Sequence, residues 1–320
     1  MSEDGYAVRL EGVTKRFGKH TAVSELDLEV PRGVIYGLLG PNGSGKTTSI
    51  RMIMGILHPD EGRVSLFGAD ADDARRRRVG YLPEERGVYR KMKCLDFVTF
   101  LAEIRGVPRA EGRKRGLYWL ERLGLPEWAD KKVEDLSKGM QQKIQFIGTV
   151  IHEPELLILD EPFSGLDPIN QDALEEIVLD FHGRGTTILF STHLMDQAER
   201  LCQRVCLISK ARKVLDADLR ELKAAERKGL LVVEFDGPDR WLQGPEVQSV
   251  ETVNGVTHLV LHDSADHQAI LRRGVESGAT IYRFDLVEPR LHEIFVRRVG
   301  AAAAEEAGVP RNDTLGGGRR

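Results

Sequence analysis

Eight consecutive residues, from Gly40 to Thr47, have the types and spacing of a loop that binds phosphate groups. The glycines allow the backbone to curl so that successive N–H groups point at phosphate oxygens. Lys46 places a positive charge beside the outer phosphates, and the hydroxyl of Thr47 suits Mg²⁺. The stretch therefore predicts a site for a nucleoside triphosphate with its metal ion.

Local patterns on either side place this loop between a strand and a helix. The apolar run 34–39 is typical of a buried strand, and residues 47–57 have the pattern of a helix. The amino-terminal end of that helix carries a partial positive charge that would face the phosphates. A plain glycine-rich turn is the alternative, because 33 of the 320 residues are glycine. The strand before the loop and the helix after it favour nucleotide binding.

Two carboxylates end another buried strand. The aliphatic run Leu156–Leu159 is followed directly by Asp160 and Glu161. An aspartate at such a strand end is where nucleoside triphosphatases place a group that organises Mg²⁺. A glutamate beside it can hold the attacking water and accept its proton. Acidic residues often end strands, so this pair predicts hydrolysis only in combination with the phosphate-binding loop.

The composition is that of a globular protein, with 41% hydrophobic and 30% charged residues. A net charge of −4 gives no general attraction to nucleic acid. The run Arg75–Arg78 is interpreted as a solvated helix end rather than a nucleic-acid site. Cys202 and Cys206 are expected to be reduced core thiols rather than zinc ligands. No apolar run approaches the ~20 residues that span a bilayer, so any membrane-spanning part is expected from another chain.

The order of strand and helix patterns predicts an α/β fold in two domains. Residues 1–228 alternate between strands and helices, which indicates a mostly parallel sheet. Within them, apolar residues recur at helical spacing over about 89–152, which predicts a mainly helical insert. Residues 229–299 are expected to form a small α/β accessory domain. Residues 300–320 are predicted to be a disordered tail, although Ala301–Ala304 could extend the last helix.

An ordered set of motifs over about residues 6–222 resembles the ATP-binding subunits of ABC transporters, which are phosphate-loop nucleoside triphosphatases. The set includes a signature loop, Leu136–Met140, that separates this family from other phosphate-loop proteins. The residues that the resemblance assigns to nucleotide binding are Phe17, Gly40, Asn42, Gly43, Ser44, Gly45, Lys46, Thr47, Thr48, Glu84, Ser137, Gly139 and Asp167.

Roles follow from the resemblance. It implies that Phe17 stacks on adenine, that Glu161 activates the attacking water, and that His193 steadies the γ-phosphate. Lys46, Glu161 and His193 are thus the expected catalytic residues, and Thr47, Glu84 and Asp160 the expected Mg²⁺ residues. It also implies a homodimer in which each ATP lies between the phosphate loop of one copy and the signature loop of the other.

The sequence departs from the family pattern at two places. Glu84 stands where the family usually has glutamine, and this assignment depends on the preceding run Tyr81–Pro83, because Glu85 is an equally charged neighbour. Glutamate brings a full charge toward the other carboxylates, which predicts a stronger Mg²⁺ requirement. In the signature loop, Lys138 and Met140 replace the more frequent glycine and glutamine.

The chain most resembles the sodium- and drug-efflux branch of this family, through the runs Tyr81–Gly87 and Glu288–Val296. That branch implies a peripheral ATPase on the cytoplasmic side of the cell membrane, with ATP and Mg²⁺ as cofactors. It powers export through a separate permease, and no nucleic-acid partner is expected. An importer subunit is one alternative, and a non-transport ATPase acting on ribosomes or nucleic acid is another.

Overall fold

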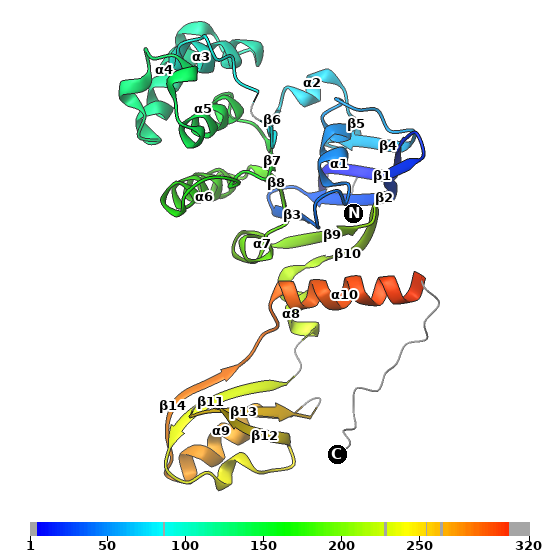
Figure 1. Cartoon of the computed structure of the whole chain (residues 1–320), viewed down its shortest axis with the longest axis vertical. Helices are drawn as coiled ribbons and strands as arrows, with labels where there is room; N and C mark the ends of the chain where they lie inside the picture. The colour runs from blue at the N-terminus through cyan, green and yellow to red at the C-terminus, as the bar shows by residue number, and fades with distance from the viewer. Residues whose placement is uncertain (1–4, 86, 227–228, 254, 263–264, 307–320) are drawn as a thin grey trace. The chain divides into compact units, whose positions relative to one another are not determined.

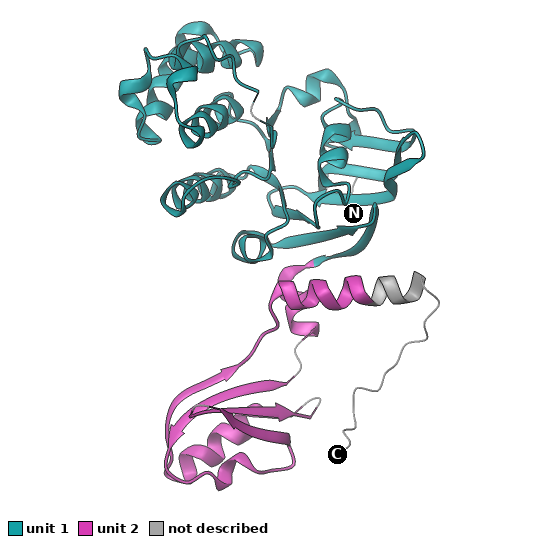
Figure 2. Ribbon diagram, in the orientation of Figure 1, with its two compact units in different colours: residues 1–217 teal, residues 218–320 magenta. Residues whose placement is uncertain are grey.

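The computed structural model describes residues 5–85, 87–226, 229–253, 255–262 and 265–306, the last six of these by backbone alone. The chain forms two compact units, residues 1–217 and residues 218–320 (Figure 2). Within the described residues, no helix is both long and apolar enough to cross a membrane.

The first unit contains a six-stranded sheet that carries most of the expected site. Its strand order is β10-β9-β3-β8-β7-β6, and the neighbours from β9 to β6 run parallel (Figure 1). Strands β3, β7 and β8 consist wholly of buried residues, which explains their continuous apolar runs. The strands are β3 (Ile35–Leu39), β6 (Val79–Leu82), β7 (Leu156–Asp160), β8 (Thr187–Thr192), β9 (Arg204–Ser209) and β10 (Arg212–Asp218).

A second, four-stranded sheet of this unit has the order β2-β1-β4-β5. Its pairs are antiparallel, in strands β1 (Tyr6–Phe17), β2 (His20–Pro31), β4 (Glu61–Leu66) and β5 (Ala69–Asp70). The helix α1 (Lys46–Ile53) contacts both sheets, and its residues Ile50 and Ile53 are fully buried in their shared core. The first unit thus has an antiparallel sheet beside the parallel sheet that the alternation predicted.

Helices fill the chain between β6 and β7, as the periodicity predicted. They are α3 (Cys94–Ile104), α4 (Arg109–Arg122) and α5 (Lys138–Val150), with short 3-10 turns at Pro126–Trp128 and Val133–Asp135. All three helices contact one another. Elsewhere the unit contains α2 (Asp73–Arg76), α6 (Pro168–Gly183) and α7 (Met195–Leu201). The helix α2 contains the first arginines of the 75–78 run. Arg77 is exposed, whereas Arg75, Arg76 and Arg78 are half-buried, so the run is only partly solvated.

The second unit is built on an antiparallel sheet of order β12-β13-β11-β14. Its core includes Leu231, Leu259 and Ile270, which are fully buried, together with Trp241. Its elements are α8 (Leu219–Ala225), β11 (Leu230–Asp236), a 3-10 turn at Arg240–Leu242, β12 (Val247–Val253), β13 (Val256–Leu261), α9 (His267–Glu276), β14 (Thr280–Leu286) and α10 (Leu291–Glu306).

Two expected boundaries differ from the structure. The units divide after residue 217 rather than 228, because α8 belongs with the second unit. Glu226, at the end of α8, forms ion pairs with Arg297 and Arg298 of α10, at 3.0 Å for Arg297. Helix α10 continues to Glu306, so residues 300–306 are helical rather than disordered. The remaining part of the predicted tail, 307–320, lies outside the described residues.

Candidate functional site

The loop between β3 and α1 requires glycine at two positions. Gly40 has φ +152°, and a Cβ atom there would lie 2.1 Å from the carbonyl oxygen of Ile208. Gly45 has φ +111°, and its Cβ would lie 2.4 Å from the carbonyl oxygen of Ala22. Neighbouring backbone therefore leaves no room for a side chain at either position. This close packing holds the loop against β9 and β2.

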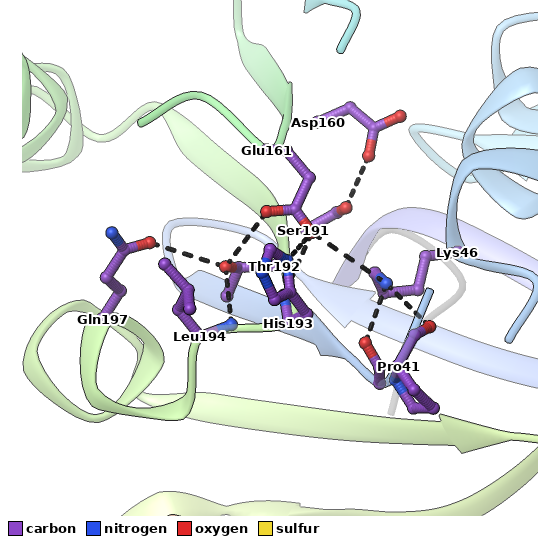
Figure 3. Close-up of polar contacts among 10 residues, drawn as sticks. Pro41, Lys46, Asp160, Glu161, Ser191, Thr192, His193, Leu194 and Gln197 are labelled. Atoms are coloured by element: carbon purple, nitrogen blue, oxygen red, sulfur yellow. Dashed lines mark hydrogen bonds and ion pairs between the residues drawn. The ribbon is translucent and has the colours of Figure 1, made fainter. Parts of the chain in front are cut away.

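Lys46 is the first residue of α1, and its side chain is only 6% exposed. Its ammonium donates to the carbonyl oxygens of Gly40 at 2.8 Å and Pro41 at 3.2 Å, and lies 4.0 Å from an oxygen of Glu161 (Figure 3). Burial lowers the pKa of Lys46, whereas the charges of Glu161 and Asp160 oppose that change. The structure therefore brings this lysine and the carboxylate pair together, as the sequence predicted.

Asp160 ends β7 and is 1% exposed. Its Oδ1 accepts a hydrogen bond from the Ser191 hydroxyl at 2.5 Å, whereas Oδ2 is buried without a hydrogen-bond partner among the described residues. Burial raises the pKa of Asp160, and hydrogen bonding from the side chains of Ser191 and Thr47 acts against this change. A buried carboxylate beside the hydroxyl of Thr47 is suited to a hard cation. The residue therefore fits the Mg²⁺ that the sequence predicts.

No group of three or more His, Cys, Asp or Glu side chains in the described part of the chain could hold a metal ion by itself. Mg²⁺ usually takes only one or two protein carboxylates and completes its shell with water and phosphate oxygens. The donor set at Asp160 and Thr47 thus fits a cation that arrives with a nucleotide.

The orientation of Glu161 is fixed by its backbone conformation and by two contacts with His193. Its backbone is left-handed, with φ +49°, which residues other than glycine rarely adopt. Its Oε1 accepts from the backbone N–H of His193 at 3.0 Å and lies 2.8 Å from the ring Nδ1. When Glu161 is ionised and His193 is neutral, Nδ1 carries the proton and Nε2 is left as an acceptor. The backbone and His193 together fix the direction of this carboxylate.

Two supporting residues were not predicted from the sequence. The hydroxyl of Thr192 lies 3.4 Å from Oε2 of Glu161 and 3.5 Å from the amide oxygen of Gln197, which is on α7 (Figure 3). The same hydroxyl accepts from the backbone N–H of Leu194 at 3.0 Å. Thr192 and Ser191 stand directly before His193, and this adjacency is the one sequence signal that could have identified them.

A pocket of about 440 Å³ opens over the loop. It brings together residues from β1, β2, the loop, α1, the segment after β6 and the end of β7. Phe17, 48% exposed, lies at its rim, as expected for an aromatic residue available for stacking. His20 and Ala22 were not predicted. The described lining is Phe17, His20, Ala22, Asn42, Gly43, Gly45, Lys46, Thr47, Thr48, Glu84 and Glu161.

The structure separates the two neighbouring glutamates of the 81–87 run. Glu84 lines the pocket, and its charge acts on the pKa of Lys46. Glu85 lies 3.5 Å from Arg51, and its carbonyl oxygen accepts from the side chain of Gln145. This arrangement favours Glu84 over Glu85 as the residue at the position where glutamine is usual.

Three expected site residues lie on other loops. Ser137 is the N-cap of α5, and its hydroxyl accepts from the backbone N–H of Met140 at 3.3 Å. Gly139 is in the first turn of the same helix, and Asp167 caps α6 by accepting from the N–H of Asn170 at 3.1 Å. Ser137, Gly139 and Asp167 are absent from the described lining of the pocket.

A phosphate-binding loop between a strand and a helix, with an aspartate and a glutamate at the end of another strand of the same parallel sheet, defines a phosphate-loop nucleoside triphosphatase. Comparison with known families agrees. Residues 23–164 match the family model described as ABC transporter, and residues 218–299 match that of the ATP-binding protein DrrA1-3-like, C-terminal domain.

Relatives extend the match over most of the chain. An uncharacterized ABC transporter ATP-binding protein, YhaQ of Bacillus subtilis (strain 168), is 43% identical over 91% of this chain and 98% of its own length. The Nod factor export ATP-binding protein I of Ralstonia nicotianae is 35% identical, covering 91% and 93%. The chain belongs to the ATP-binding proteins of ABC transporters, a family of ATP-binding ATPases.

Solved structures match about two thirds of the chain. An ATP-binding subunit of an ABC transporter has a TM-score of 0.64 and 29% identity, over 68% of this chain and 92% of its own. A dimeric ATP-binding cassette with bound ADP and phosphate has a TM-score of 0.61 at 23% identity, over 67% of this chain and 99% of its own, and shows the shared fold.

Proposed function

We propose that this chain hydrolyses ATP to power export through a separate membrane permease, from the cytoplasmic side of the membrane. The observation that carries hydrolysis is the position of Glu161, which directly follows β7 with its side chain 9% exposed, is held by His193 and lies 4.0 Å from Lys46. Export is supported by the name of the Nod factor relative and by the match of residues 218–299 to a DrrA-like domain.

Each residue of the site has a distinct role in this proposal. Lys46 exchanges the carbonyl oxygens of its own loop for the outer phosphates of ATP. Glu161 orients the attacking water and takes its proton, and His193 presents Nε2 toward the γ-phosphate side. Thr47 and Asp160 hold Mg²⁺, which neutralises charge on the phosphates when bound. Phe17 stacks on adenine.

The active form is a homodimer. Ser137 caps α5 on a loop that is not part of the pocket lining, so its helix end is available to a second copy. The positive end of a helix favours a phosphate group. In the closed dimer, Ser137 and Gly139 of one copy meet the triphosphate held by Lys46 of the other, and Asp167 lies on the loop between the copies.

A groove of about 590 Å³ between the helical insert and β6 is the surface proposed for the permease. It combines apolar residues of α3 with Arg76, Arg77 and Arg105, and with Asp73, which lies 3.6 Å from Arg76. Arg105 donates to the carbonyl oxygen of Arg76 at 3.1 Å, and burial lowers the pKa of its guanidinium. Among the described residues no carboxylate pairs with Arg105, so the groove suits a permease segment that carries acidic residues.

Helix α5, which lines this groove, also contacts the end of β6 and the segments that follow β6 and β7. Gln145 and Thr149 of α5 donate to the carbonyl oxygens of Glu85 and Tyr81, both at 3.3 Å. Gln142 of the same helix donates to the carbonyl oxygen of Pro162, next to Glu161. A segment seated against the insert can therefore move α5 and the residues that follow β6 and β7 together.

The proposed partnership is tested with the Arg105→Glu variant. Co-expressed with its permease, the variant is expected to co-purify from membranes at about a tenth of the wild-type yield or less, because a charge reversal at an interface costs ~2 kcal/mol or more. Its ATP binding should remain, since Arg105 does not line the nucleotide pocket. The control is Arg113→Glu, an exposed residue of α4 that lies outside the groove lining. Equal recovery of both variants would contradict docking in this groove.

Glu84 is expected to make the protein depend more strongly on Mg²⁺. One unit charge at 4 Å in water is worth about 1 kcal/mol, so without Mg²⁺ the Glu84→Gln variant should bind ATP about fivefold more tightly than wild type. Because the glutamate attracts the cation, the variant should need about fivefold more Mg²⁺ at half-saturation. Mg²⁺ titrations of nucleotide binding and of hydrolysis measure this shift. Glu85→Gln, whose side chain is 86% exposed, is the matched control. Superimposable curves for wild type and Glu84→Gln would show that Glu84 has no part in the metal requirement.

A further inference from the structure

The turn between β1 and β2 directs two side chains into the nucleotide pocket. Phe17 and His20 are direct partners across this antiparallel hairpin, and Gly18 in the turn has φ +60°. Residues that face each other in this way project from the same face of the sheet. Both side chains line the pocket over the phosphate-binding loop. His20 is therefore part of the pocket wall, beside the aromatic residue proposed to stack on adenine.

The pocket wall continues from His20 along β2 to the loop. Lys15 pairs with Val23 and Arg16 with Thr21, so the register skips Ala22, which forms a β-bulge. Ala22 also lines the pocket, and its carbonyl oxygen would lie 2.4 Å from a Cβ atom on Gly45. The bulge thus brings the backbone of β2 close to the phosphate-binding loop. The wall runs in order from Phe17 through His20 and Ala22 to Gly45.

This order matches the covalent order of a nucleotide. Phosphates bind the loop and the start of α1, and a base stacks on Phe17, so the sugar lies against the wall between them. Ala22 offers no polar side-chain group there. The other polar side chains of the described lining belong to the loop, to α1, to Glu84 or to Glu161. An imidazole can donate or accept a hydrogen bond, which suits a ribose hydroxyl.

We propose that His20 hydrogen-bonds a ribose hydroxyl of the bound nucleotide and so makes the pocket selective against nucleotides that lack that hydroxyl. This assignment depends on the proposed function, because it requires ATP or ADP in the pocket with adenine at Phe17. Removing the ribose hydroxyl and removing the imidazole should then have effects that are not additive, since each removal breaks the same hydrogen bond.

Equilibrium binding of ADP, 2′-deoxy-ADP and 3′-deoxy-ADP to the full chain tests the proposal by calorimetry without hydrolysis. Wild type should bind ADP about three- to tenfold more tightly than at least one of the deoxy analogues, as expected for one hydrogen bond. In His20→Ala this preference should fall below about twofold, chiefly through weaker ADP binding. His20→Asn, which keeps a hydrogen-bonding group, should retain part of the preference.

Lys19→Ala is the matched control, because Lys19 lies in the same turn but is not part of the described pocket lining. It should keep the wild-type preference. The proposal is overturned if wild type does not discriminate among the three nucleotides, or if His20→Ala weakens all three equally. Failure of wild type to bind any of them would instead refute the proposed function.

Discussion

The Glu161→Gln variant is expected to hydrolyse ATP about 10²–10⁴ times more slowly than wild type, the usual contribution of a general base. Glutamine keeps the size of the side chain and an oxygen that can accept from the backbone N–H of His193, now 3.0 Å from Glu161. It cannot accept a proton from water. Steady-state phosphate release measures the loss, and affinity for ATP should stay within about threefold because phosphate contacts remain.

The same variant tests the proposed dimer. With hydrolysis blocked and ATP and Mg²⁺ saturating, the closed dimer should accumulate, and size-exclusion chromatography with light scattering in the presence of the permease would detect it. Glu176→Gln, an exposed change on α6, should behave as wild type in both assays. A Glu161→Gln protein that hydrolyses ATP at the wild-type rate, or that never pairs, would refute the assigned role or the shared site respectively.

The Lys46→Met variant is expected to lose about 10²–10³-fold in kcat/KM for ATP, the usual effect of removing one preorganised group at a site of developing charge. Lys46 is the cation nearest Glu161 in the described site, at 4.0 Å, and its ammonium faces the loop that holds the phosphates. Methionine fills a similar volume without the charge. Calorimetric titration with ADP and a hydrolysis assay would separate weaker binding from slower chemistry.

Misfolding is not expected to explain this loss. Burial disfavours the charged form of Lys46 and lowers its pKa. Methionine therefore removes the free-energy cost of burying a charge, which offsets the loss of two hydrogen bonds. The midpoint of thermal unfolding should therefore change little. Lys114→Met, an exposed change on α4, provides the control. Unaltered kcat/KM in Lys46→Met would remove the lysine from the mechanism.

Much of the fold could be predicted from local patterns of apolar residues in the sequence. Strands β3, β7 and β8 are buried on both faces, so their runs are continuously apolar and easily recognised. The elements that sequence pattern alone does not reveal are exposed, irregular or short. Strand β1 continues to Phe17 through several register shifts, and such shifts interrupt the alternation that identifies strands. Helix α7 has only seven residues, too few for a clear period.

The sequence by itself determined the phosphate-binding loop and the acidic pair. Each is a contiguous motif whose chemistry is set by residue type and spacing. Only the tertiary structure decided that Ser191 hydrogen-bonds Asp160, that His193 holds Glu161, and that His20 faces the pocket. Those contacts join residues on neighbouring strands, and strand pairing is a long-range property that spacing along one segment does not encode.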